Sequence, residues 1–509
     1  MARLPLTKSV PPYLRALLLL LLGNALIHAG LGFSLGLSGD EAHYALYAAH
    51  PALSYYDHPP LVGWLQIPLV WLGAPAGVLR LLPGALWLAT AVLVHALGQR
   101  LHQQIDPAAP TQAVQQSGWW ALLAFSLAPL PHVLGMGLLP DTLLMCMTAA
   151  LMLQTLRLQD HGRAQQLHQW LLLGALLGLA GLAKYTAIFV ALPVAACLLA
   201  THGASLLRRA APWWALTIAL VLVAPVFVWN AQNHWMSFVY QLHHGAGSDW
   251  RLAHLATFLL VQALLYPLLL WGALVASRPI RNAPGSARWL LSFALLPLAA
   301  LAYLAGGGSS LPHWTAPAWV ALAPVAGIGL QALWRSGRRR LVWLLGSLQV
   351  FFCLALYVLM LSAGPPWLQS RGDMDESINP FSDFYGWEEA GVRARRWSAQ
   401  LGIPRLAVQN WTLASRLAWY AQPLPVHVIA PGFDQFSLWS GELPRADSAI
   451  LLGWSQMAYH LPVGAGQFAQ CEALDRFAVV RAGRPVAHFS LHACKGWGGQ
   501  PQPRRIGEP

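Results

Sequence analysis

Long apolar runs recur through the first 363 residues of this chain, and polar or basic loops separate them. In lipid, only helices and closed barrels satisfy all of their own backbone hydrogen bonds, and a helix needs about 20 apolar residues to cross. Only 10% of the residues are charged, whereas a soluble domain carries about 25%. The sequence therefore predicts an α-helical polytopic membrane protein.

A search window of about 19 residues gives about eleven spans. They cover approximately residues 14–37, 78–97, 117–134, 141–156, 168–183, 186–200, 212–229, 252–276, 289–305, 314–333 and 341–362. The first run is too long for the core of a signal peptide and lacks a small-residue cleavage site, so we expect it to remain as the first span. The run from His58 to Gly73 is apolar but interrupted by prolines, which predicts a helix along the membrane surface and not a crossing.

Arginine clusters occupy every second loop, beginning with the N-terminal segment, and the intervening loops carry only Arg80, Lys184 and Arg251. The cytoplasmic loops of membrane proteins are the basic ones. We therefore expect a multi-pass protein of the bacterial inner membrane with its N-terminus in the cytoplasm. An odd number of spans places the C-terminal segment in the periplasm. The basic loops also account for the net charge of +12, so nucleic acid is not an expected partner.

The composition changes near residue 364, where charged residues become frequent and the long apolar runs end. Alternating apolar residues at 406–408 and 426–429 predict short strands, and the segment Trp387–Leu401 predicts a helix. We expect a transmembrane domain at 1–363 followed by a periplasmic α/β domain at 364–509.

The five cysteines fall into two groups. Cys146, Cys197 and Cys353 lie in apolar runs, where packed thiols are expected. Cys471 and Cys494 lie in the C-terminal domain, where a disulfide can form if that domain is outside the cytoplasm. The sequence leaves this disulfide open.

Carboxylates are scarce in the apolar part of the chain, where only seven precede residue 364. Five of them fall on the predicted outer side, namely Asp40, Glu41, Asp57, Asp141 and Asp249. Asp40 and Asp141 lie at the outer ends of different helices, an arrangement suited to a general base and an acid that orients a substrate. Each also fits a helix cap, because Asp is a favoured N-cap and Pro140 is typical of a helix start. Both interpretations stay open.

Lys184 and Arg80 are isolated cations on the predicted outer side, where a cation either extends into lipid headgroups or binds a phosphate. The histidines of that side are His43, His58, His243, His244 and His313. Their spacing matches no metal-binding motif, so we assign no metal ligand and leave a divalent metal open. The chain also lacks a Walker A phosphate loop, which argues against a conventional nucleotide site. A donor for group transfer is then expected in the outer leaflet, as a lipid-linked sugar.

Several motifs follow one another along the chain. They are Asp40-Glu41-Ala42-His43-Tyr44, Tyr55-Tyr56-Asp57-His58-Pro59-Pro60-Leu61 with Trp64, Arg80-Leu81, Pro140-Asp141, Gly181-Leu182-Ala183-Lys184-Tyr185-Thr186, Trp229-Asn230-Ala231-Gln232, and His313-Trp314 with Pro317. In this order they resemble the bacterial GT-C glycosyltransferases, the relatives of the protein O-mannosyltransferases and the lipid A aminoarabinose transferase. The C-terminal segment resembles one bacterial branch at Gly386-Trp387, Ala414-Ser415, Trp419-Tyr420, Gln435-Phe436 and Trp439. The aminoarabinose-transferase branch carries Lys where this chain has His58.

The resemblance implies a GT-C fold and an inverting transfer of sugar from a polyprenyl-phosphate donor to an acceptor hydroxyl on the periplasmic face. The acceptor is left open among lipid A, another glycan, a lipid and a protein. The family's catalytic acid falls on Asp40, its second acid on Asp141 and its lysine on Lys184. We hypothesise that Asp40 takes the acceptor proton while Lys184 helps to neutralise the departing phosphate. The other predicted substrate contacts are Glu41, Tyr55, Asp57, His58, Arg80 and His313.

Two other classes of function compete with this hypothesis. A flippase or transporter of polyprenyl-linked sugars predicts charged groups near mid-membrane and symmetry between the two halves, neither of which the sequence shows. A non-catalytic envelope assembly protein predicts only a partner for the C-terminal domain. An assay for a new glycoside separates all three.

Overall fold

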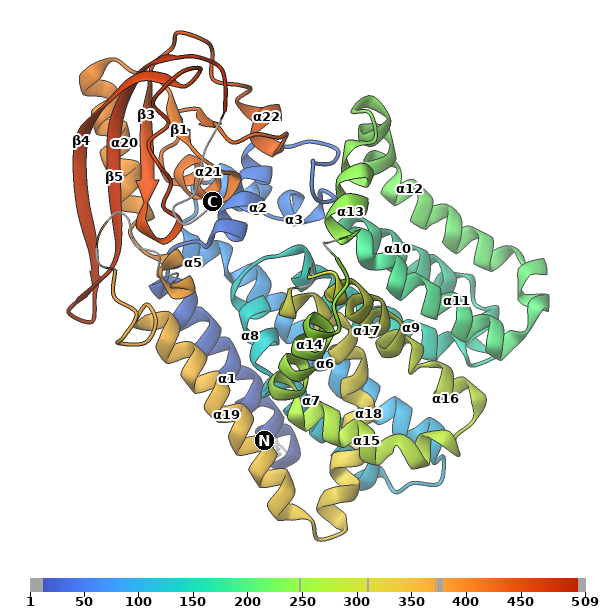
Figure 1. Cartoon of the computed structure of the whole chain (residues 1–509). Helices are drawn as coiled ribbons and strands as arrows, with labels where there is room; N and C mark the ends of the chain where they lie inside the picture. Colours follow the sequence, from blue (N-terminus) through green and yellow to red (C-terminus); the bar gives the residue numbers. More distant parts are fainter. Residues whose placement is uncertain (1–11, 247–248, 309–310, 371, 373–378, 502–509) are drawn as a thin grey trace, which may run out of the picture.

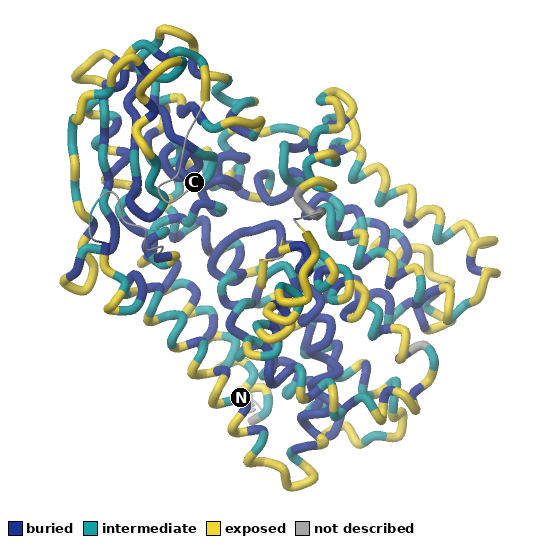
Figure 2. Tube along the Cα trace, in the orientation of Figure 1, coloured by how far each residue is buried: buried dark blue, intermediate teal, exposed yellow. Residues whose placement is uncertain are grey.

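The computed structural model describes residues 12–246, 249–308, 311–370, 372 and 379–501. Helices α1 to α19 form one bundle, and a domain with a five-stranded sheet lies at one end of it (Figure 1). Figure 2 shows the buried segments at the centre of the bundle and exposed segments along its outer helices. Within α18 (Ala316–Arg335), 17 of the 20 residues are buried, whereas α12 (Ala210–Gln232) buries only three. The bundle is therefore built around α18, with apolar outer helices suited to contact lipid.

Among the described residues, seven helices are long and apolar enough to cross a membrane, or up to nine if each of two bent pairs counts as one span. The seven are Tyr13–Ser34, Ala76–Ile105, Tyr185–His202, Ala210–Gln232, Ala287–Gly306, Pro312–Arg335 and Arg339–Leu361. The expected number of about eleven also included α9 (Pro140–Leu158) and α10 (Leu167–Ala183). These two helices are inside the bundle, but neither is both long and apolar enough to be counted.

Two expected spans are bent and not straight. The first divides into α7 (Thr111–Ser126) and α8 (Pro129–Met136), which meet at 71°, and the second into α14 (Leu252–Leu265) and α15 (Pro267–Arg281), which meet at 92°. Each second helix begins with a proline. Proline disfavours helical geometry in the residue before it and lacks an N–H for the preceding turn, so the chain breaks there.

The segment after the first span contains α2 (Gly39–Ala49), α3 (Leu61–Trp64) and α4 (Ile67–Trp71). As expected, no described helix in this region crosses the bundle, but two short helices replace the single surface helix predicted for 58–73. Close packing holds α3 against α2. A side chain at Gly63 would place its Cβ only 2.4 Å from Cβ of Tyr47, so glycine is required there.

The C-terminal domain has a mixed sheet in the order β2-β1-β3-β5-β4. Its strands are β1 (Leu406–Val408), β2 (Val426–Val428), β3 (Ala449–Trp454), β4 (Phe468–Arg481) and β5 (Arg484–Trp497), and its helices are α20 (Trp387–Leu401), α21 (Trp411–Tyr420) and α22 (Gln435–Trp439). β1 pairs in parallel with β2 and β3, whereas β3, β5 and β4 pair antiparallel. The predicted helix and the two predicted strands are confirmed.

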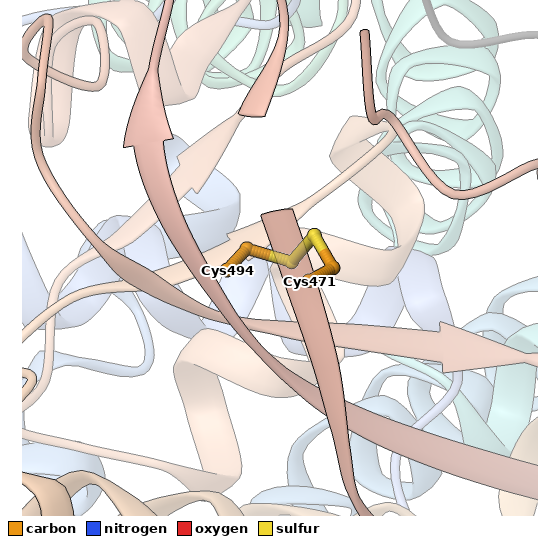
Figure 3. Close-up of a disulfide and its surroundings, with 2 residues drawn as sticks. All are labelled: Cys471 and Cys494. Atoms are coloured by element: carbon orange, nitrogen blue, oxygen red, sulfur yellow. A yellow bond between two sulfur atoms is a disulfide. The ribbon is translucent and has the colours of Figure 1, made fainter. Parts of the chain in front are cut away.

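A disulfide joins Cys471 on β4 to Cys494 on β5, where the two residues face each other in the antiparallel pair (Figure 3). The disulfide that the sequence left open is therefore formed in the structure. Cys146, Cys197 and Cys353 are free and buried, as expected for packed thiols.

Candidate active site

The first turn of α2 directs two neighbouring acids to different places. Ser38 is the N-cap in extended conformation, and its hydroxyl accepts from the backbone N–H of Glu41 at 3.4 Å while the Glu41 carboxylate accepts from the Ser38 backbone N–H at 3.0 Å. This reciprocal capping box fixes the helix start. Ser38 therefore fills the cap position that the sequence had allowed for Asp40, which leaves the Asp40 side chain available.

Glu41 and Arg80 are bound to each other. The Arg80 guanidinium donates to both carboxylate oxygens of Glu41 at 2.7 Å, and its remaining N–H groups donate to the carbonyls of Gly32, Leu35 and Gly36. Both side chains are buried. Their charged groups are thus used to fix the junction between α1 (Pro12–Ser34) and α2, which differs from the substrate contacts expected for them.

Asp141, Lys184 and His313 converge from three segments. Lys184, directly after α10, donates through Nζ to both oxygens of Asp141 at 2.7 and 2.8 Å, and Nε2 of His313 lies 3.9 Å from the same carboxylate. Asp141 and Lys184 are buried. The N-cap of α9 is Leu139, so Asp141 does not serve as the cap. The Asp141 carboxylate therefore holds two possible N–H donors, Lys184 and His313, at one point.

Asp57 is held from several sides. The Tyr47 hydroxyl donates to its carboxylate, Nε2 of His43 lies 3.4 Å from it, and the Gln241 side chain donates to its backbone carbonyl at 2.6 Å. Burial alone raises the pKa of Asp57, but His43 and Tyr47 outweigh it and hold the pKa below its ordinary value. Tyr55 stacks on Tyr47 at 3.5 Å between ring centroids and donates its hydroxyl to the Tyr47 carbonyl. Asp57 is therefore a charged group in a fixed position, and Tyr55 holds in place the Tyr47 side chain that binds it.

Asp40 differs from the other acids of this cluster. Within the described ranges, its carboxylate makes no hydrogen bond or ion pair, although His313, His43 and Arg416 lie within electrostatic range. Desolvation raises the pKa of Asp40 above its ordinary value, and the three neighbouring cationic or ionisable groups only partly offset it. A carboxylate with unoccupied oxygens and a raised pKa has the properties of a general base.

His58 also faces the cluster without a fixed partner. Its Nδ1 is buried and makes no hydrogen bond to any described residue, while Asp57, Lys184 and Asp141 lie in electrostatic range. Burial lowers the pKa of His58 to about 4, so the ring is neutral at pH 7. A neutral ring with an unpartnered Nδ1 beside the Lys184–Asp141 pair is suited to hydrogen bonding with a substrate.

The C-terminal domain supplies groups that the sequence did not identify. Arg416 on α21 is buried, its guanidinium lies 4.3 Å from the Trp387 ring centre and 4.6 Å from that of Trp454, and it forms an ion pair with Asp383. Burial lowers the pKa of Arg416 to about 9. Asp383 in turn accepts from the backbone N–H of Gly39 at 3.0 Å. This chain of contacts ties the domain to the first turn of α2.

A second contact between the domains involves His43. Its Nδ1 lies 3.0 Å from the Ser415 hydroxyl, its Nε2 faces Asp57, and the ring packs among Trp411, Tyr44 and other aromatic rings. The resemblance had marked Ala414-Ser415 as a motif, but no spacing rule relates residues 43 and 415. Only the fold shows that the C-terminal domain contacts α2.

Among the residues that the structure describes, no group of three His, Cys, Asp or Glu side chains is arranged to hold a metal ion. The charged groups of the site other than Asp40 instead pair with one another. The site thus combines the Asp40 carboxylate, which has no partner among the described residues, the neutral ring of His58 and the buried pair of Lys184 and Asp141.

Comparison with known proteins shows which family and which solved structures this chain is similar to. Residues 57–229 match the family described as dolichyl-phosphate-mannose-protein mannosyltransferase. The structure is similar to ArnT from Cupriavidus metallidurans in the apo state, with a TM-score of 0.60 and 14% identity over 94% of this chain and 98% of ArnT. ArnT bound to undecaprenyl phosphate matches over the same shares with a TM-score of 0.59 and 14% identity. No curated protein has a matching sequence. At this identity the likeness shows the fold, which is the ArnT-like GT-C fold.

Proposed function

We propose that this chain, a membrane protein of the GT-C glycosyltransferase type, moves a sugar from a polyprenyl-phosphate donor to an acceptor hydroxyl with inversion at the anomeric carbon. The observation that supports this most directly is the state of Asp40. Among the described acids at the outer loop, Glu41, Asp57 and Asp141 are each bound to a neighbouring side chain, whereas the Asp40 oxygens are unoccupied. A general base needs free oxygens within reach of the acceptor.

In the proposed reaction, the acceptor oxygen attacks the anomeric carbon and its proton passes to Asp40. The bond between that carbon and the phosphate oxygen breaks, and the electron pair leaves with polyprenyl phosphate. Lys184 has three N–H donors, of which Asp141 accepts two, so one is left for the phosphate. His313 lies beside the same carboxylate and adds a second donor. Donors placed where negative charge develops stabilise the transition state.

Asp141 and Asp57 have supporting roles in this proposal. Asp141 holds Lys184 and His313 at one point, and Asp57 fixes the outer loop beside His58. Glu41 and Arg80 fix the base of the same loop through their mutual pairing. We therefore assign these groups to positioning and keep direct substrate contact for Asp40, Lys184, His58 and His313.

The lipid donor and the side of the membrane are part of the proposal. The similar ArnT structure holds undecaprenyl phosphate, which supports a polyprenyl-linked donor. Disulfides persist outside the cytoplasm, so the Cys471–Cys494 bond supports a periplasmic C-terminal domain, as does the arginine pattern of the alternate loops. The site lies on the side of that domain.

An assay for a new glycoside tests the proposal. Purified protein in lipid vesicles is given polyprenyl phosphate carrying a radiolabelled sugar, together with an extract of bacterial envelopes. We expect label to leave the polyprenyl lipid and to appear in a new glycoside. If the protein only moves the intact labelled lipid between leaflets, it is a flippase. If it leaves the lipid unchanged, the proposal is wrong.

A further inference from the structure

A groove of about 310 Å³ lies between the start of α2 and the C-terminal domain. Its lining includes Asp40, Asn379, Asp383, Thr412, Arg416 and Met457. The groove therefore combines the Asp40 carboxylate with side chains from three stretches of the C-terminal domain, at residues 379–383, 412–416 and 454–457. Neither of the two groups assigned to the phosphate, Lys184 and His313, is part of this lining.

Inversion requires that the nucleophile and the leaving group lie on opposite sides of the anomeric carbon. If the phosphate occupies the site at Lys184, the acceptor must approach Asp40 from a different direction. The groove provides such an approach, because Asp40 lines it and also lies within electrostatic range of His313. On the basis of the proposed function, we propose that this groove binds the acceptor, and that the acceptor is a sugar hydroxyl of a glycan or a glycolipid headgroup.

The chemistry of the lining favours a sugar. The paired Arg416 and Asp383 supply hydrogen-bond donors and acceptors with little net charge, and the amide of Asn379 and the hydroxyl of Thr412 add neutral polar groups. This set matches a polyhydroxylated ring that both donates and accepts. Pockets for small molecules span about 300–1,000 Å³, so the groove has room for a short glycan segment.

An extended peptide is less well matched to the same groove. Extended peptides commonly bind by adding a strand to the edge of a sheet, through backbone hydrogen bonds. The edges of this sheet are β2 and β4, and neither contributes a residue to the groove. Recognition there depends on side chains, as for a compact polar ligand.

The test narrows the groove without changing Asp40. Thr412→Phe places an aromatic ring in the groove, and Val480→Phe is the matched control at a position that is 57% exposed on β4. Transfer is measured with labelled polyprenyl-phosphate sugar while the glycolipid fraction of an envelope extract is titrated. We expect Thr412→Phe to raise the half-saturating amount of that fraction by at least about tenfold, with half-saturation by the donor unchanged. The control should match the wild type in both.

A second variant, Met457→Phe, narrows the groove from a different segment and covers the case in which Thr412→Phe fails to fold. If both variants fold and saturate with the same amount of the glycolipid fraction as the wild type, the groove does not bind the acceptor. If the label enters the protein fraction of the extract instead, the acceptor class is wrong. If the wild type forms no glycoside at all, the proposed function fails, and the groove proposal fails with it.

Discussion

The buried pair of Lys184 and Asp141 offers a way to separate stability from catalysis. Two hydrogen bonds of 2.7 and 2.8 Å join the side chains, and both residues are nearly inaccessible to solvent, at 6% and 4% exposure. Lys184→Met leaves the Asp141 carboxylate buried without its cation. Removing one partner of such a pair costs about 3–5 kcal/mol in the free energy of unfolding. The double variant Lys184→Met/Asp141→Leu removes both charges and should recover most of that loss.

Activity should not recover with stability. In our proposal Lys184 stabilises the charge that develops on the departing phosphate, and loss of such a donor lowers the rate by about 10²–10³-fold. Unfolding is followed by titration with SDS in detergent micelles, and transfer is measured with labelled donor lipid. A matched control is Arg393→Met, which removes the partner of Asp475 and Glu389 from partly exposed ion pairs and should cost no more than about 1 kcal/mol.

The reasoning is refuted in either of two ways. If the double variant regains transfer together with stability, Lys184 acts only as a partner for Asp141. If Lys184→Met is no less stable than the Arg393→Met control, the pair is not the buried contact that the structure shows.

Three further predictions concern the titration and support of the site. The rate of transfer should decline as the pH falls through the pKa of Asp40, because only the ionised carboxylate accepts a proton. Desolvation raises this pKa above the ordinary 3.8. A rate that rises as the pH falls contradicts this role. His58→Asn should raise the KM for the donor and leave the pH profile near neutrality unchanged, because His58 has a pKa of about 4; a shifted profile contradicts this. Ser415→Ala should lower the free energy of unfolding by about 1–3 kcal/mol, because Nδ1 of His43 loses its partner. The same variant should lower kcat more than it changes KM. An unchanged free energy of unfolding contradicts this prediction.

Much of the architecture could be predicted from local pattern. Apolar runs indicated the membrane bundle, and the helix at Trp387–Leu401 and the strands near 406 and 426 follow from their periodicity and turn residues. The bends at Pro129 and Pro267 were missed because a window of about 19 residues averages over a break of one turn. The expected number of about eleven spans exceeds the seven to nine helices that are long and apolar enough to cross a membrane. The difference includes α9, which is largely buried in the bundle and therefore needs less apolar character than a helix that faces lipid.

The candidate site was predictable only in part. The sequence singled out Asp40, Asp141 and Lys184 as candidates because isolated charges in an apolar chain are costly. The sequence could not show that Arg80 binds Glu41, since 39 positions separate the two residues and either could have faced a substrate. Arg416 was missed because it lies in a polar domain where an arginine is ordinary, and only tertiary packing places it beside α2. Contacts between residues that are far apart in the sequence can be identified only from the fold.

The central claim is that Asp40 is the base for glycosyl transfer, and the most direct measurement compares Asp40→Asn with Asp106→Asn. Asp106 is exposed and accepts one local backbone hydrogen bond, so its substitution serves as the matched control. We expect Asp40→Asn to lower the rate of transfer by about 10²–10⁴-fold, equivalent to about 3–5 kcal/mol of transition-state stabilisation. Its stability should fall by no more than about 0.5 kcal/mol, since the Asp40 carboxylate makes no hydrogen bond or ion pair within the described ranges. An Asp40→Asn protein that transfers sugar at the rate of the control would contradict the account.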